Sequence, residues 1–278
     1  MLKYFKINQI LFAKHNGYAF NLFPHNCDLN LERPRNTYFI RHISKFDEFS
    51  SAEWFYVIKD KLEDITTYSS KIRNQIKNGL KHCTIKQEYD INKIYNIYKN
   101  VNANYNNKVL SFRKFKKHYE YCRQISDFKI HFWLISYQEI PVGYSKVCVS
   151  NDQIAFYEEI SIIKEFKKIY ANYALIHTMN KYYLNQCHFN FVTDGSRNIY
   201  HHTQIQDFLI YKFQFRKAFC QLHVKYNFIT KFIIIILAPF YNQMNNINRH
   251  FYYKIQTLIF QDKISKATNT WKLNNEIY

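Results

Sequence analysis

Apolar residues recur with a helical period in the segment 62–81. They follow one another at steps of three and four residues, which gathers them on one face of a helix and leaves a face rich in Lys, Arg and Asn for solvent. The pattern predicts a helix that ends near Gly79. The apolar positions of this face are Ile65, Tyr68, Ile72, Ile76 and Leu80.

The following 140 or so residues alternate between strand-like and helix-like patterns. The predicted order is β-α-α-β-β-β-α-β-α-β, with a tight turn at 138–141 and a polar turn at 194–197 that includes Gly195. The predicted strands are 83–87, 130–137, 142–149, 153–163, 189–193 and 215–219, and the predicted helices are 91–101, 112–122, 171–186 and 203–213.

The two ends of the chain have a different pattern. Up to about Asp60, short alternating segments such as 37–40 and 54–58 are separated by turn residues, which predicts an N-terminal extension of short strands. In the tail, the β-branched run 233–236 favours a strand, whereas the segment 248–260 indicates helical packing. Both conformations of the tail stay open.

Composition and net charge indicate which class of partner the chain binds. The chain has 278 residues, of which 47% are hydrophobic and 19% aromatic, enough to bury one large core or two modest ones. Its net charge of +18 predicts attraction to phosphates on nucleic acid, on an anionic membrane face or on a nucleotide-bearing substrate. Basic residues are dense over 59–129, where a binding patch and a solvated helix face are equally good interpretations.

Cysteine spacing and the N-terminus bear on location. The six cysteines form no C-x-x-C pair and have no His/Cys spacing suited to zinc, so we expect reduced thiols and no metal. The apolar piece at the N-terminus is too brief for a secretory signal, which favours a cytoplasmic location. The run 232–237 is short of the roughly 20 residues that span a bilayer. A position of this run in a membrane interface, and with it a location peripheral to the membrane, stays open.

The element order resembles the fold of GNAT acyltransferases, a mixed sheet split near its middle. The segment 69–81 looks like the helix that precedes the GNAT domain in Fem-type aminoacyl transferases, which are related to peptidoglycan synthesis; with gaps, the similarity extends over 54–226. This resemblance implies an α/β (α+β) class, a GNAT-like mixed sheet with helices on both faces. It also implies three parts: the extension 1–60, an acyltransferase domain 61–226, and a helical or hairpin tail 227–278.

A second resemblance lies in 162–175, where GNAT proteins carry a pyrophosphate-binding loop. Aligned on the following helix, Lys167 takes the basic position, while Tyr170 and Asn172 replace glycines that let backbone N–H groups approach a diphosphate. The resemblance implies a donor site formed by Lys167, Tyr170, Asn172 and Tyr173. The donor stays open between acyl-CoA (acetyl-CoA) and the aminoacyl-tRNA used by Fem-type enzymes.

Many GNAT enzymes have a tyrosine that protonates the departing thiolate, and the matching stretch here is 209–215. When the two stretches are aligned on their final Phe, the position of the GNAT tyrosine falls on Ile210. Tyr211 is one residue further along and is rotated by about 100° from Ile210 on a helix. We therefore expect Tyr211 to cover the core or the surface, and Leu209 and Phe213 to be ordinary core residues.

Acyl transfer needs a base and polar groups that hold the substrate. Glu158 and Glu159 end a central strand, and because side chains alternate along a strand, we expect one of them to point inward, where apolar surroundings raise its pKa. The alternative is that one pairs with a Lys or Arg and the other faces water. Arg73, on a basic helix face shared with Lys77, is a candidate for substrate binding.

A second polar cluster follows the strand that ends near residue 193. Asp194 stands at the carboxyl end of this strand, where open α/β sheets bind ligands. Asp194 and His202 are candidate catalytic residues, and Arg197 and His201 candidate substrate-binding residues. A capping or turn-stabilising role is the competing interpretation.

The resemblance to these families implies an acyl- or aminoacyl-transferase that acts on an amine or hydroxyl of a small molecule or polymer precursor, with tRNA as a possible partner. Two alternatives stay open. One is a catalytically degenerate GNAT-fold protein that binds a phosphorylated ligand, and the other is a basic nucleic-acid-binding module.

Overall fold

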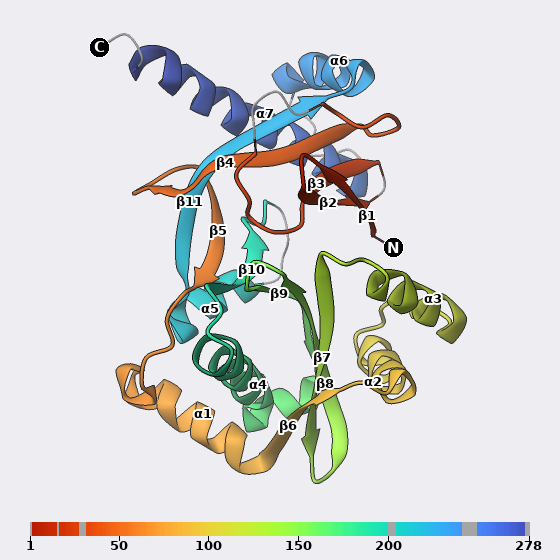
Figure 1. Ribbon diagram of the computed structural model, residues 1–278, viewed down its shortest axis with the longest axis vertical. Coiled ribbons are helices and arrows are strands. Elements are labelled where there is room, and N and C mark those ends of the chain that lie inside the picture. Colours follow the sequence, from red (N-terminus) through yellow and green to blue (C-terminus); the bar gives the residue numbers. More distant parts are fainter. Residues whose placement is uncertain (1, 16, 28–31, 200–203, 241–248, 276–278) are drawn as a thin grey trace. The chain divides into compact units, whose positions relative to one another are not determined.

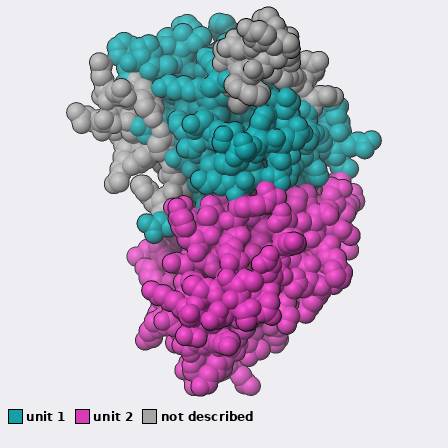
Figure 2. All heavy atoms as spheres, turned by 90° about the vertical axis from the view of Figure 1, so that its left-hand side faces the viewer, with its two compact units in different colours: residues 1–56, 196–206, 217–278 teal, residues 57–195, 207–216 magenta. Residues whose placement is uncertain are grey.

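The computed structural model describes residues 2–15, 17–27, 32–199, 204–240 and 249–275 (Figure 1). Contacts divide the chain into two compact units, each built from several chain segments (Figure 2). Unit 1 comprises 1–56, 196–206 and 217–278, and unit 2 comprises 57–195 and 207–216. The three-part division at residues 60 and 226 stays a prediction.

Unit 2 contains a mixed sheet in which four consecutive strands form an antiparallel meander and a fifth runs parallel to the last of them. The strand order is β5-β10-β9-β8-β7-β6, and β5 enters this unit only with its last residues. The strands are β5 (Trp54–Lys59), β6 (Cys83–Glu88), β7 (Phe128–Tyr137), β8 (Ile140–Ser150), β9 (Ile154–Ile162) and β10 (Phe191–Ser196).

The helices follow the strands in the predicted order, so the succession β-α-α-β-β-β-α-β-α-β is confirmed from β6 to β11. Short 3-10 turns stand before α1, at Ile65–Thr67, and before α4, at Lys164–Ile169, and α4 continues into a π-helical turn, Lys181–Gln186. The helices are α1 (Ser70–His82), α2 (Ile91–Asn104), α3 (Phe112–Arg123), α4 (Ala171–Asn180) and α5 (Ile205–Phe213).

Helices cover both faces of the unit 2 sheet. On one face, α2 packs against β7 and β8, where Leu134 and Tyr144 meet Ile94. On the opposite face, Trp133 of β7 lies 5.0 Å from the ring of Tyr182, which follows α4. Figure 1 shows α2 and α3 on one side of β7 and β8 and α4 on the other. The expected mixed sheet with helices on both faces is present.

Three local predictions are wrong, each for a local reason. The first helix begins at Ser70 rather than at residue 62, because the Ser69 hydroxyl caps it by accepting from the Ile72 N–H. The turn predicted at 138–141 is shorter, since Gln138 and Glu139 take the left-handed conformation and β8 starts at Ile140.

The turn predicted at 194–197 is a continuation of the strand. β10 runs on to Ser196, and the Arg197 N–H donates to the Phe55 carbonyl at 2.8 Å. Gly195 does take a positive φ of 91°, but within the strand.

Unit 1 contains strands that pair in the order β1-β2-β3-β4-β11. β3 and β4 are parallel and the other pairs are antiparallel. The extension 1–60 therefore has strands as predicted, although β4 is 11 residues long and not short. β11, predicted at 215–219, is also 11 residues long. The strands are β1 (Lys3–Ile7), β2 (Ile10–His15), β3 (Tyr18–Asn21), β4 (Phe39–Phe49) and β11 (Arg216–Tyr226).

The tail is helical where the structure describes it. α6 (Phe228–Leu237) contains the β-branched run that favoured a strand, and α7 (Arg249–Asn275) follows. The Asn227 side chain starts α6 by accepting from the Thr230 N–H at 2.7 Å, and Ile234 packs on Ile255 of α7. Capping and packing outweigh the intrinsic preference of the isoleucines.

Candidate functional site

The parallel pairing of β9 with β10 is short. It joins 154–156 to 191–193, whereas β9 runs on to Ile162 and β10 to Ser196 beyond this register. Glu158, Glu159 and Asp194 follow within three residues of the last paired position. Three predicted catalytic carboxylates therefore stand just past the point where the pairing of the two central strands ends, at the carboxyl ends where ligands bind in open sheets.

A β-bulge in β9 controls where two of these carboxylates point. Lys146 pairs with Glu159, and the next residue, Val147, pairs with Tyr157, so Glu158 is an extra residue in β9. The alternation that predicted one inward and one outward carboxylate is interrupted here. Both side chains contact residues of β8 that share one face of the sheet, so the prediction of opposite orientations is wrong.

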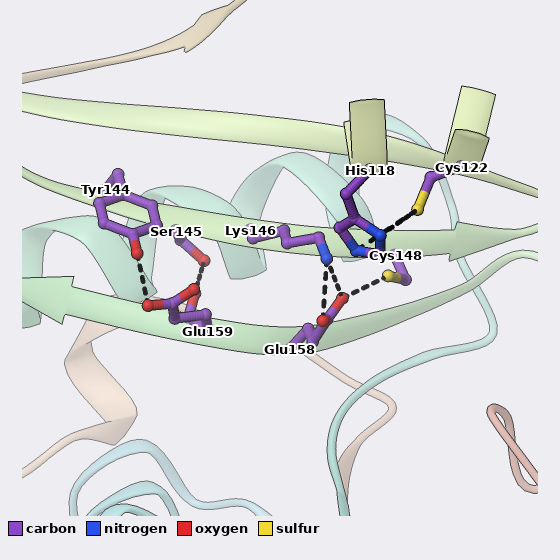
Figure 3. A network of polar contacts seen from close by, with 8 residues as sticks. All are labelled: His118, Cys122, Tyr144, Ser145, Lys146, Cys148, Glu158 and Glu159. Carbon is purple, nitrogen blue, oxygen red and sulfur yellow. Dashed lines mark hydrogen bonds and ion pairs between the residues drawn. The ribbon is translucent and has the colours of Figure 1, made fainter. Parts of the chain in front are cut away.

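Glu158 is held by a cation and a thiol. Its two carboxylate oxygens each lie 2.8 Å from the Lys146 Nζ, and the Cys148 thiol donates to Oε2 at 3.0 Å (Figure 3). The Lys146 side chain is 11% exposed and that of Glu158 20%. The pair is therefore largely shielded from solvent, which strengthens its electrostatic attraction.

Glu159 is held by hydroxyl groups instead. The Tyr144 hydroxyl donates to Oε1, and the Ser161 hydroxyl donates to the same oxygen at 3.3 Å. The Ser145 hydroxyl donates to the Glu159 backbone carbonyl at 2.8 Å, which fixes the bulge (Figure 3). Glu159 thus has hydrogen-bond donors where Glu158 has a cation.

The pKa values of the two glutamates are shifted in opposite directions. Burial raises the pKa of Glu158, but the charge of Lys146 and the hydrogen bond from Cys148 outweigh burial, and the pKa lies below its ordinary value. Burial also raises the pKa of Glu159, and the hydrogen bond from Tyr144 does not offset it, so this pKa lies above its ordinary value. The expectation of a raised pKa holds for Glu159 and not for Glu158.

Helix α3 contributes a histidine near the Lys146–Glu158 pair. Burial and the positive charge of Lys146 lower the pKa of His118 to about 4, so the ring is neutral at pH 7. The His118 ring lies 3.7 Å from the Cys122 sulfur (Figure 3). No group of three or more His, Cys, Asp or Glu side chains in the described ranges is arranged to hold a metal ion.

Most partners of the two glutamates were not singled out from the sequence, among them Tyr144, Lys146, Cys148 and His118. A signal for three of them was present, because they follow one another at two-residue steps in a predicted strand, and Lys146 is a charge within an apolar run. No pattern in the sequence indicated His118, which reaches the network from a separate helix.

The predicted donor loop leads from the 3-10 turn into α4. Tyr170 takes the left-handed conformation, with φ 62°, that the glycine-rich loops reach through glycine, and it stands at the N-cap of α4. Lys167 is exposed, with its Nζ 5.2 Å from the Tyr105 ring, and Asn172 is half-buried. Tyr173 is buried and packs on Phe208 at 5.1 Å, so it is part of the core.

The two predicted substrate-binding arginines have partners within the chain. Arg73 donates to the backbone carbonyls of Thr66 and Tyr68, at 2.9 and 3.0 Å. Arg197 forms an ion pair with Glu53 at 2.9 Å and lies over the ring of Phe260. A role in substrate binding stays a prediction for both.

The remaining candidates have mixed outcomes. Asp194 is half-buried on β10, and its catalytic role stays a prediction. His201 and His202 lie outside the described residues. Tyr211 is 76% exposed, while Leu209 and Phe213 are fully buried, as the sequence predicted.

The fold of the chain is similar to those of solved structures. A crystal structure of FemX matches with a TM-score of 0.51 at 10% identity, over 81% of this chain and 86% of that one. The chain has the fold of FemX. This likeness confirms the predicted mixed α/β class, and at 10% identity it establishes the fold alone.

Two further solved structures are similar to a lesser degree. One is the C-terminal DUF2156 domain of a protein described as a lysylphosphatidylglycerol synthetase from Agrobacterium fabrum, with 7% identity over 86% of this chain and 88% of that one. The other is a functionally unknown conserved protein from Staphylococcus epidermidis, with 11% identity over 69% and 74%. Their TM-scores of 0.48 and 0.41 are lower than that of FemX. No family model matches the sequence, and the search of curated proteins found no relative.

Proposed function

We propose that this chain is an acyl- or aminoacyl-transferase of the Fem-like type. It moves an acyl group from an ester or thioester carrier to an amine or hydroxyl, with a surface-polymer precursor as the acceptor. The observation that carries the proposal is the short parallel pairing of β9 with β10, in a chain with the fold of FemX, with Glu158 and Glu159 directly beyond the last paired position.

In this proposal Glu159 is the general base. The acceptor nitrogen or oxygen attacks the carbonyl carbon of the donor, the bond from that carbon to the carrier oxygen or sulfur breaks, and the acceptor proton passes through Glu159 to the leaving atom. Its raised pKa suits this transfer, because a base works best when its pKa approaches the working pH. Glu158 and Lys146 keep the bulged strand in place and do not take the proton.

The donor that fits the loop best is aminoacyl-tRNA. Tyr170 and Asn172 occupy positions where close approach to a diphosphate requires glycine, and the Tyr173 side chain is engaged in the core. The loop still offers cations for a phosphate backbone, since Lys164, Lys167 and Lys168 are exposed. Contacts of this kind predict binding that weakens steeply with salt.

Competing donors test the proposal. The protein is incubated with tRNA charged with labelled amino acids, or with labelled acetyl-CoA, in the presence of an amine-bearing polymer precursor, and the labelled product is measured. The proposal predicts transfer from charged tRNA. Transfer from neither donor, combined with salt-dependent binding of uncharged RNA, would replace it with a nucleic-acid-binding module. Transfer from neither donor without RNA binding would favour a catalytically inactive protein with this fold.

A further inference from the structure

Helix α6 carries large apolar side chains on its outside. Two residues of the helix, Thr230 and Ile234, are buried. Six of the other residues are exposed and apolar, and they form a surface that we call the α6 stripe. Its members, with their exposed fractions, are Phe228 83%, Ile229 66%, Phe232 55%, Ile233 39%, Ile235 58% and Ile236 46%.

The α6 stripe is continuous. With a rotation of 100° per residue, its six positions fall within an arc of about 160°, and the buried positions Thr230 and Ile234 lie outside that arc. Phe240, in the 3-10 turn that follows, is 52% exposed and falls within the same arc if the helical rotation is continued. Single exposed apolar residues are ordinary, but a contiguous apolar patch of this kind marks an interaction surface.

The opposite side of α6 fixes it to the unit. Ile234 packs against Ile255 and Ile259 of α7, and Leu237 lies at the edge of this cluster. Figure 1 shows α6 at the end of β11 with α7 beside it. The helix is therefore held by its narrower face, and its wider apolar face points away from that support.

Charge identifies the kind of surface that fits the stripe. Between Asp207 and Asp262 the sequence has no Asp or Glu, while it has seven Lys or Arg residues. Lys231 lies on α6 itself and is exposed at the border of the stripe. Apolar side chains with a cation at their border, in a stretch of sequence without acidic residues, complement a bilayer surface with anionic headgroups.

We propose that α6 is a membrane-surface anchor that lays its stripe into the interface of an anionic bilayer. With ten residues, the helix is only about 15 Å long, which suits a position in the plane of the interface. No helix in the described parts of the chain is long and apolar enough to cross a membrane. This inference does not depend on the proposed transferase activity.

Vesicle binding tests the anchor. The full chain is sedimented with phosphatidylcholine vesicles and with vesicles that also contain phosphatidylglycerol, at low and high salt. The double variant Phe232→Ser/Ile236→Ser removes two members of the stripe. Tyr211→Ser, which removes an exposed aromatic residue from α5, is the matched control.

We expect binding to the phosphatidylglycerol vesicles that weakens with salt, falls at least about tenfold in the double variant and is unchanged in Tyr211→Ser. Absence of binding to these vesicles overturns the proposal, as does equal binding to both vesicle types. Sedimentation velocity of the parent protein without lipid distinguishes membrane binding from self-association. A dimer that the double variant converts to a monomer, without vesicle binding, would assign the stripe to a second copy of the chain.

Discussion

The β8–β9 network and the α6 stripe depart from the usual distribution of residues in opposite ways. In unit 2, a lysine and two glutamates lie largely buried in the sheet, whereas in unit 1 a helix exposes phenylalanine and isoleucine. Each arrangement costs stability relative to an apolar interior or a polar surface. Such departures are expected where side chains serve chemistry or binding, so the contrast identifies the two places in which function is most readily sought.

The largest effect is expected from removing the buried cation. Lys146→Met leaves the Glu158 carboxylate shielded and without its ion-pair partner, and should lower the free energy of unfolding by about 3 kcal/mol. Urea unfolding measures the change. Lys116→Met, in the exposed pair with Glu120, is the matched control and should change it by less than about 0.5 kcal/mol. Equal losses in the two variants would show that the Lys146–Glu158 pair is energetically like a surface pair.

A somewhat smaller loss is expected where α1 approaches the donor loop. A Cβ on Gly79 would lie 2.5 Å from the Tyr170 carbonyl oxygen, so Gly79→Ala should force α1 away from α4 and cost about 2 kcal/mol, despite the helical preference of alanine. Thermal unfolding checks this. Asn78→Ala, at an exposed position of the same helix, should be neutral or slightly stabilising. A stabilised Gly79→Ala variant would contradict the close packing.

The histidine beside the network gives a pH dependence of stability. Its folded-state pKa of about 4 is below the unfolded value of 6.5, so below pH 6.5 the unfolded chain takes up a proton that the folded chain excludes. Stability should therefore fall as the pH drops from 6.5 to 4. In His118→Gln this loss should be smaller by about 1–2 kcal/mol, as measured by urea unfolding across that range. An unchanged slope in the variant would show that His118 is not shielded.

The smallest effect on stability is expected in the α6 stripe. Phe232 is 55% exposed, so Phe232→Ser should change the free energy of unfolding by less than about 0.5 kcal/mol in the absence of lipid. Urea unfolding of this variant and of Lys146→Met compares the α6 stripe with the β8–β9 network. A loss similar to that in Lys146→Met would mean that the stripe is covered within the folded chain.

Periodicity in the sequence predicted the element order of the fold because most elements are amphipathic. The packing of Ile94 under the sheet, for example, follows from the 3.6-residue period of α2. The conformation of α6 could not be predicted from periodicity, because six neighbouring apolar residues have no clear period. Capping by Asn227 decided the outcome. Local rules that outweigh intrinsic propensity are the common reason for such failures.

The candidate site was predicted in part. Glu158 and Glu159 were identified by their place at the end of a central strand, and both belong to the network. Their orientation was not predictable, since a single inserted residue in β9 reverses the alternation and leaves no mark in composition. The opposite pKa shifts arise because the Lys146 charge outweighs burial at Glu158, whereas the Tyr144 hydrogen bond does not outweigh burial at Glu159. Both partners reach the carboxylates only through the register of β8.

A single-turnover transfer assay with Glu159→Gln, at a saturating concentration of charged tRNA, tests the central claim most directly. Loss of the general base should slow transfer by about 100-fold or more while donor binding stays unchanged. Glu120→Gln, at an exposed position of α3, should react like the parent. A transfer rate in Glu159→Gln equal to that of the parent would contradict the account, because the carboxylate beyond the β9–β10 pairing would then have no part in the chemistry.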